Sequence, residues 1–443
     1  MRDAQSQSIV TMRPGSHPRF RAPREAASWW VQCAAVCALA FLAGGCSPSP
    51  ETVIEVAISQ AKLGFAGLAP TSWESLSAYP SEQVVEVAER LLEESNDSNV
   101  RLRAIATLKH YALTGRGRPF KERLSALARI VLFDRDPQVA EYAIDILISS
   151  GNDEDVHLIA KRLQSARDPL LVRDLFGALR MRNAWAVIVS ELNKSFPEGA
   201  NDADRQDWYL RMTCAMEMFH LAKSKGTEIT PEVLSRIVSL IEHYPRLSEE
   251  GVRSLVAMEA TSAVPDLRRI FSETDSLDTK LAVVAGLIIL DKERTGNRSV
   301  AVEMVRRAVA NYQRGAWPWD RAILPIKWLA FAAFGSDDFG LLLDVWRECA
   351  PLDFHRKADI LCEMARDTLL TTYLLVDLLA TVSDEDLLQI LVYSPEFRSV
   401  LAFHLPFYSY EKRTPQARVL DLQAQERRVR AFIRQSEVLA AHH

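Results

Sequence analysis

From Glu51 onward, the apolar residues recur about every 3.6 positions, the spacing of one face of an α-helix. In the segment 83–92 one face collects apolar side chains and the other collects glutamates, namely Val84, Val87, Ala88, Leu91 and Leu92 against Glu82, Glu86, Glu89 and Glu93. Ser81 precedes this segment and is expected to cap it. No convincing set of alternating strands is present. The pattern therefore predicts an all-α protein.

Short polar breaks separate the predicted helices, and a pattern recurs after several of them. An acidic cap is followed by apolar residues three, seven and eleven positions later. The copies are Asp97/Val100/Ala104/Leu108, Asp136/Val139/Ala143/Leu147, Asp168/Leu171/Leu175/Leu179 and Asp278/Leu281/Ala285/Ile289, with a weaker one at Glu249/Val252/Val256/Ala260. Second helices, such as 120–132 and 154–163, lie between them. Each unit is thus predicted to be a helical hairpin of about 30–40 residues.

These residues resemble the HEAT repeat and its shorter relatives. The resemblance rests on Asp136-Pro137-Gln138-Val139 with Ala143-Ile144 and Leu147, and on Asn99-Val100-Arg101 with Ala104-Ile105 and Leu108. It is clear over 97–192, thinner over 247–290 and inferred beyond. One hairpin cannot bury its apolar face alone, so hairpins stack. The resemblance implies a right-handed α-solenoid, or superhelix, of HEAT-like hairpins over residues 51–410. Ala104, Ala143 and Ala285 are expected to be buried where helices cross closely.

Two regions depart from the repeat. The polar stretch 195–207 is a candidate hinge within the repeats. The last helix is predicted over 416–439, with an arginine-rich polar face, and residues 411–443 are interpreted as a capping element because a terminal repeat needs a polar outer face. The apolar run 369–379 is short and contains Asp377, which favours a buried helix over a membrane span.

Residues 1–45 have the composition of a targeting segment. Five arginines precede an unbroken apolar run of 11 residues from Cys33 to Ala43, which is too short to span a bilayer. The run ends in Leu42-Ala43-Gly44-Gly45-Cys46, followed by Ser47-Pro48-Ser49-Pro50. Met12 is an alternative start.

This arrangement resembles the lipobox of bacterial lipoproteins. The resemblance implies a signal peptide over 1–45, a lipid-modified Cys46 as the new N-terminus, and a tether over 46–50. It places the protein on the cell envelope, anchored to a membrane by lipid, with the periplasmic face expected. A cleaved secretory signal without lipid, giving a secreted or periplasmic protein, and an uncleaved anchor are the alternatives.

Charge and cysteine usage narrow the choice of partners. The whole chain has net charge −5, and without residues 1–45 the net charge is −8. Such a chain has no global electrostatic reason to bind nucleic acid.

Cys214, Cys349 and Cys362 remain after the leader and Cys46 are set aside. Helix geometry would hold Cys349 and Cys362 roughly 12 Å apart along a helix axis, too far for a disulfide. All three are predicted to be buried free thiols.

No catalytic or metal-binding motif is evident. The chain has no GxSxG, GxxxxGK[ST] or HExxH segment, and no histidine is followed by glutamate. We therefore predict no catalytic residue, no metal site and no cofactor. The sequence favours a non-enzymatic scaffold or module that binds a protein or peptide. The alternative is an enzyme whose site forms across repeats, which would show as a pocket with strongly perturbed carboxylates or histidines.

The segment Gly315-Ala316-Trp317-Pro318-Trp319-Asp320 is predicted to be a loop that precedes a helix. Two tryptophans two positions apart in a loop cannot easily enter one core. Trp317 and Trp319 either fill a junction between repeats or contact a partner, because tryptophan is over-represented in binding hot spots. Trp328, by contrast, fits the apolar face of the helix and is expected in the core.

Overall fold

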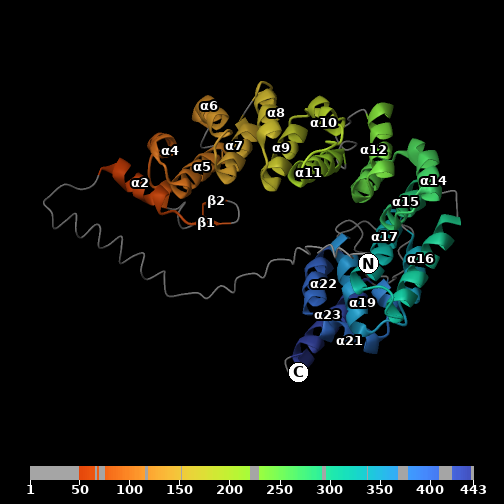
Figure 1. Ribbon diagram of the computed structural model, residues 1–443. Helices are drawn as coiled ribbons and strands as arrows, with labels where there is room; N and C mark the ends of the chain where they lie inside the picture. Colours follow the sequence, from red (N-terminus) through yellow and green to blue (C-terminus); the bar gives the residue numbers. More distant parts are fainter. Residues whose placement is uncertain are drawn as a thin grey trace, which may run out of the picture. The chain divides into compact units, whose positions relative to one another are not determined.

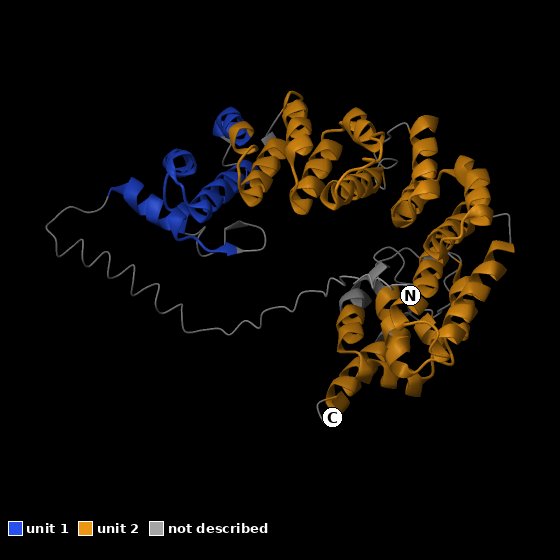
Figure 2. Ribbon diagram, viewed as in Figure 1, with its two compact units in different colours: residues 1–128 blue, residues 129–443 orange. Residues whose placement is uncertain are grey.

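The computed structural model describes residues 49–64, 67–68, 75–114, 118–150, 152–219, 229–291, 296–336, 338–367, 378–408 and 422–440. The chain divides into two compact units, residues 1–128 and 129–443, and the division falls within one helix, α6 (Figure 2). Apart from one short hairpin of two-residue strands, the described elements are helices, which confirms the all-α prediction. None of these described helices is long and apolar enough to cross a membrane.

In the described part of the first unit, helices α2 (Pro50–Ser59), α4 (Ser81–Glu94) and α5 (Ser98–Leu113) pack against one another, and a short hairpin contacts α5 (Figure 1). Strand β1 pairs antiparallel with β2, and Leu63 lies opposite Leu68. The elements are α2 (Pro50–Ser59), β1 (Leu63–Gly64), β2 (Gly67–Leu68), α4 (Ser81–Glu94), α5 (Ser98–Leu113), η1 (Arg118–Phe120) and α6 (Lys121–Val131).

The described elements of the second unit are helices and short 3-10 turns. They are α7 (Pro137–Ser150), α8 (Asp155–Ser165), α9 (Pro169–Met181), α10 (Trp185–Leu192), α11 (Asp202–Phe219), α12 (Pro231–His243), η3 (Pro245–Leu247), α13 (Ser248–Ala257), η4 (Thr261–Ala263), α14 (Val264–Glu273), α15 (Leu277–Leu290), α16 (Gly296–Gln313), α17 (Trp319–Ser336), α18 (Phe339–Glu348), α19 (Phe354–Asp367), α21 (Asp384–Tyr393), α22 (Pro395–Tyr408) and α23 (Leu422–Ala440).

The helices of the second unit pack in a regular order. Helices α7, α9, α11, α13, α15, α17 and α19 each contact the next one in that series. Helices α8, α10, α12, α14 and α16 each pack against the helix that follows them in sequence. Each of the helices α9, α11, α13, α15 and α17 therefore packs between two other helices of that series.

Several arginine side chains join elements that lie more than 40 residues apart in the sequence. Each guanidinium donates hydrogen bonds to carbonyl oxygens at or just beyond the last turn of a helix 42–49 residues earlier. Those carbonyls have no partner within their own helix, so the arginine satisfies them. The bonds run from Arg103 to Ser59, from Arg211 to Leu163 and Ala166, from Arg236 to Leu192 and Lys194, and from Arg428 to Leu379 and Val382.

Most of the expected acidic caps are present. The carboxylates of Asp97, Asp136 and Asp168 accept hydrogen bonds of 2.8–3.0 Å from backbone N–H groups in the first turns of α5, α7 and α9. Asp278 does not cap α15: the Ser276 hydroxyl accepts from the Thr279 N–H, and Asp278 lies inside the first turn.

Two other expected caps are also wrong. Ser81 is the first residue of α4, which begins after Pro80 without a side-chain cap. Glu249 lies inside α13, which begins at Ser248 directly after the turn η3, so the preceding turn removes the need for a side-chain cap.

The predicted core positions are buried. Ala104, Ala143 and Ala285 are fully buried, each at 0% exposure. Cys214, Cys349 and Cys362 are buried and take part in no disulfide, as predicted from the sequence. Burial raises the pKa of the Cys214 and Cys349 thiols to about 12, since the thiolate cannot be hydrated there.

The break expected over 195–207 lies inside the second unit and is shorter than predicted. Helix α11 begins at Asp202, where the Asn201 side chain accepts a hydrogen bond from the Asp204 N–H. Phe196 anchors the loop, since its ring lies 5.1 Å from the ring of Trp208 and 5.4 Å from that of Tyr244.

The chain's last described helix is α23, which packs against α21 and α22. Arg427 and Arg434 are exposed on its polar face, and Arg428 pairs with Asp384. The predicted start of this helix, residues 416–421, lies outside the described residues, and so does most of the apolar run 369–379.

Candidate partner-binding groove

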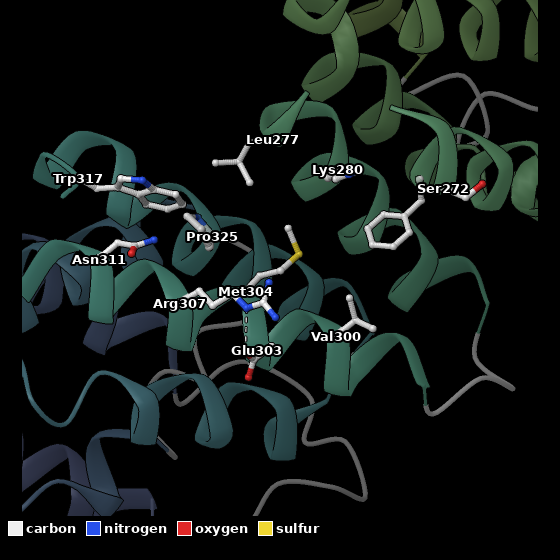
Figure 3. Close-up of a pocket in the computed structure, with 11 residues that line it drawn as sticks. Ser272, Leu277, Lys280, Val300, Glu303, Met304, Arg307, Asn311, Trp317 and Pro325 are labelled. Atoms are coloured by element: carbon white, nitrogen blue, oxygen red, sulfur yellow. Dashed lines mark hydrogen bonds and ion pairs between the residues drawn. The ribbon is translucent and has the colours of Figure 1, made fainter. Parts of the chain in front are cut away.

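A groove of about 740 Å³ lies in the second unit among α14, α15, α16 and the start of α17 (Figure 3). Apolar side chains make up about half of its lining, and polar and charged ones are placed among them. The lining residues are Phe271, Ser272, Leu277, Lys280, Val300, Glu303, Met304, Arg307, Asn311, Trp317 and Pro325.

Helix α16 supplies one wall of the groove, because one of its faces packs into the core and a second face lines the groove. One face, formed by Ala301, Val305, Ala308 and Val309, is buried, and the helix contacts α17 and α18. The second face carries Val300, Met304, Arg307 and Asn311, which follow an i, i+4, i+7, i+11 spacing and line the groove. Val300 is 41% exposed and Met304 is half-buried. At 1.5 Å per residue this second face is about 16 Å long.

The first turn of α15 forms the opposite wall. Leu277 and Lys280 lie there, across the groove from Met304 (Figure 3). The Ser276 cap fixes the start of α15 and so sets the positions of both side chains. Leu277 is half-buried although it is apolar.

Trp317 closes one end of the groove. Gly315 ends α16 in the left-handed conformation with a φ of 70°, and the N–H groups of Ala316 and Trp317 both donate to the Asn311 carbonyl, at 2.8 and 3.2 Å. This turn directs the half-buried indole toward Pro325 (Figure 3). The Arg321 guanidinium lies 4.6 Å from the centre of the ring, which orients it further.

The charges on the groove are unequal. The Arg307 guanidinium donates a 2.8 Å hydrogen bond to Glu303, which lowers the pKa of this carboxyl group and favours its ionised form. Arg306 donates a second hydrogen bond, 2.9 Å long, to the other oxygen of Glu303. Lys280 has no ion-pair partner among the described residues. The lining therefore carries two cations, Lys280 and Arg307, against one carboxylate that is already engaged.

The two tryptophans singled out from the sequence go to different places. Trp317 lines the groove, whereas Trp319 does not. The Trp319 ring lies 5.1 Å from the ring of Tyr312 and 4.9 Å from the Arg356 guanidinium, which also donates a 2.9 Å hydrogen bond to the Tyr312 hydroxyl. This cluster fastens α19 to the end of α16. Trp328 is 7% exposed, which confirms its place in the core.

Cys46 lies outside the described residues, so the lipidation prediction stays a prediction.

Apart from Trp317, the groove residues were not singled out from the sequence. The sequence does contain an indication of this groove. Val300 and Met304 are apolar and four positions apart, and each directly precedes a residue of the buried stripe, Ala301 and Val305. Helix 296–313 therefore has two neighbouring apolar faces, whereas packing against the core requires only one.

Other polar clusters in the described part of the chain are ion-pair networks. Buried Asp155 pairs with Arg129 at 2.6 Å, and buried Arg211 binds Asp207 at 2.8 Å. A smaller hollow of about 340 Å³ on the far edge of α16 contains Arg298 and Asp344, which already pair with each other at 2.6 Å. Over the same described residues, no group of three or more histidines, cysteines and carboxylates is placed to hold a metal ion.

Comparisons with known proteins add little. No family model matches the chain, and no curated protein matches it. A crystal structure of an engineered protein is similar over 78% of this chain and 98% of its own length, with 15% sequence identity and a TM-score of 0.26. A likeness at this score carries no argument about the fold or function of this chain.

Proposed function

We propose that this protein is a lipid-anchored binding protein of the bacterial cell envelope, built as a solenoid of HEAT-like hairpins, which holds a segment of a partner protein in the groove beside Trp317. The observation that carries the binding proposal is the half-buried indole of Trp317 at the end of an open, largely apolar groove. Tryptophan combines a large contact area with a hydrogen-bond donor, and it dominates many interfaces.

The solenoid part of the proposal is supported by local packing. Alternate helices of the second unit contact one another in series, and Arg211 and Arg236 bind carbonyls at helix ends 44–48 residues earlier in the chain. Asp97, Asp136 and Asp168 cap three helices at matching repeat positions. These features are the ones that a chain of stacked hairpins would need.

The envelope location is supported by the leader and the Gly44-Gly45-Cys46 segment. Mass spectrometry of the membrane-purified protein should find a chain that begins at an acylated Cys46. A Cys46→Ser variant should lose the acyl groups and leave the membrane fraction. An intact leader, or cleavage elsewhere with an unmodified Cys46, would contradict lipidation and favour the anchor or the secreted protein.

The rival function, an enzyme with a site formed across repeats, receives less support from the groove. Its one carboxylate, Glu303, has a lowered pKa and is held by Arg306 and Arg307, so it is poorly suited to donate or accept a proton near neutral pH. Among the described residues, no histidine or cysteine lines the groove. An open apolar surface with an aromatic residue at one end suits recognition of a macromolecule better.

The test is site-specific photo-crosslinking in intact envelopes. A photoreactive residue replaces Met304 inside the groove, and the matched control replaces Leu170, which is 67% exposed on α9. A partner should be crosslinked from position 304 and not from position 170. Adding Trp317→Ala should abolish the crosslink while leaving the melting temperature nearly unchanged.

The second control uses Trp319. Since its ring packs against Tyr312 and Arg356, Trp319→Ala should lower stability rather than remove a partner contact. If position 304 crosslinks no more than position 170, or if Trp317→Ala leaves the crosslink intact, then the groove is not the binding site.

A further inference from the structure

We infer that the partner segment in the groove is an amphipathic helix whose apolar face carries an acidic side chain at its edge, and that this side chain pairs with Lys280. The inference rests on the proposed function and names the chemistry of the partner. Three properties of the groove support it: the dimensions of the α16 wall, the distribution of charge, and the openness of the apolar lining.

The dimensions of the groove suit a helix. Helix α16 forms its long wall and the first turn of helix α15 lies opposite, where Met304 and Leu277 face each other across the groove (Figure 3). The face of α16 that lines the groove is about 16 Å long, which corresponds to three turns of a helix. An amphipathic helix of that length presents three or four apolar side chains at i, i+3 or i+4, and i+7, which is the usual way that helices bind in grooves.

The charge of the groove indicates which charged side chain the bound helix carries beside its apolar residues. Lys280 is half-buried and lacks an ion-pair partner among the residues described by the structure, and Arg307 shares Glu303 with Arg306. The acidic residues Glu273, Asp275 and Asp278 near the start of α15 are not lining residues, and Glu273 already binds Arg269 at 3.2 Å. A bound helix that supplied a carboxylate would complete the Lys280 pair, whereas one that supplied a cation would bury two like charges together.

The exposure of the lining argues against an acyl chain as the occupant. Phe271, Leu277, Met304 and Trp317 are all half-buried, and Val300 is exposed. Sites for small apolar ligands enclose most of the ligand surface. This groove leaves one long side open, which a helix with a polar outer face can cover and a hydrocarbon chain cannot.

The experiment is a selection from a phage library of random peptides about 12 residues long, a length that spans three helical turns. The bait is the full chain as purified from its membrane. Parallel selections use Lys280→Glu, Trp317→Ala, and the control Lys121→Glu, which alters an exposed lysine on α6. The best acidic peptide is then synthesised, together with its Glu→Gln and Glu→Lys versions, and its affinity for each protein is measured.

We expect the unmodified protein and Lys121→Glu to select the same peptides, with apolar residues at helical spacing and an adjacent Asp or Glu. Lys280→Glu should select Lys or Arg at that place and should bind the acidic peptide at least about tenfold more weakly. The Glu→Lys peptide should recover binding to Lys280→Glu. This exchange of preference identifies the pair itself, which a general loss of stability could not produce.

Several results would overturn the inference. Peptides without an acidic bias, or an acidic bias that survives in Lys280→Glu, would show that Lys280 does not choose the partner. Oleate that occupies the groove while no peptide is selected would favour a lipid ligand. A dimer that Lys280→Glu dissociates, seen by light scattering, would identify the occupant as a second copy of the chain. If Trp317→Ala selects and binds the same peptides as the unmodified protein, the proposed function at this groove fails, whatever the peptides' charge.

Discussion

The same substitution, Gly→Ala, should have opposite effects at two helical glycines of the second unit. Gly251 lies in α13 against α12. A Cβ atom added at Gly251 would lie 2.5 Å from Cγ1 and 3.0 Å from Cδ1 of Ile241, which is fully buried. Carbon atoms in contact are normally separated by about 3.5–4.0 Å, so the overlap is about 1 Å. At Gly177 in α9, an added Cβ would meet no atom within 4 Å.

Two opposing terms determine the magnitude. Alanine is more favourable than glycine in a helix interior by about 1 kcal/mol. Overpacking a core costs about 1–3 kcal/mol, and the upper end applies at Gly251 because Cγ1 of Ile241 cannot move without a change in its χ1 rotamer. Gly251→Ala should therefore lower the free energy of unfolding by about 2 kcal/mol, whereas Gly177→Ala should raise it by about 1 kcal/mol.

The assay is urea denaturation followed by far-UV circular dichroism. With a slope of about 2 kcal/mol per molar urea, the midpoint should fall by about 1 M for Gly251→Ala and rise by about 0.5 M for Gly177→Ala. In an Ile241→Ala background the added methyl group meets neither Cγ1 nor Cδ1, so Gly251→Ala should no longer be costly there. A Gly251→Ala protein at least as stable as the parent, or a cost that persists without the Ile241 side chain, would refute this account of the helix contact.

Three further predictions concern buried side chains. Ala143→Leu should lower the free energy of unfolding by about 1–3 kcal/mol in a thermal melt, because Ala143 is fully buried and a larger side chain is expected to overpack its surroundings; an unchanged melt would contradict the predicted repeat register. Arg211→Met should cost about 3 kcal/mol in the same measurement, since it leaves two carbonyls without their buried donor and removes one of the two arginines that bind Asp207, whereas Arg173→Met removes an exposed ion pair and should cost less than about 1 kcal/mol. Cys214 and Cys349 should resist a thiol reagent at pH 8 until the protein is unfolded, because burial raises the pKa of both thiols to about 12. Rapid labelling of the native protein would contradict the burial of these thiols. Because the thiols ionise at lower pH in the unfolded chain than in the folded one, the folded state should also lose stability as the pH rises above about 9.

Local sequence determined much of this protein. The 3.6-residue apolar period predicted the helices, and short-range hydrogen bonding fixed the Asp97, Asp136 and Asp168 caps. Burial was also predicted for Ala143 from its repeated position seven residues after a cap, and for Cys349 because cysteines outside disulfides are commonly buried. These features depend on residues within a few positions of one another, so one sequence is enough to recognise them.

Contacts between helices decided the rest. Ser276 rather than Asp278 caps α15, because the helix begins at Leu277, two residues earlier than a cap at Asp278 would place it. The pattern of α16 does not say which of its two faces enters the core and which lines a groove, since both carry apolar residues at helical spacing. Trp317 and Trp319 leave the same loop in different directions because α15 leaves a groove open for one ring and Tyr312 and Arg356 surround the other. A local pattern records which side chains are apolar, but neighbours distant in sequence determine which of them water can still reach.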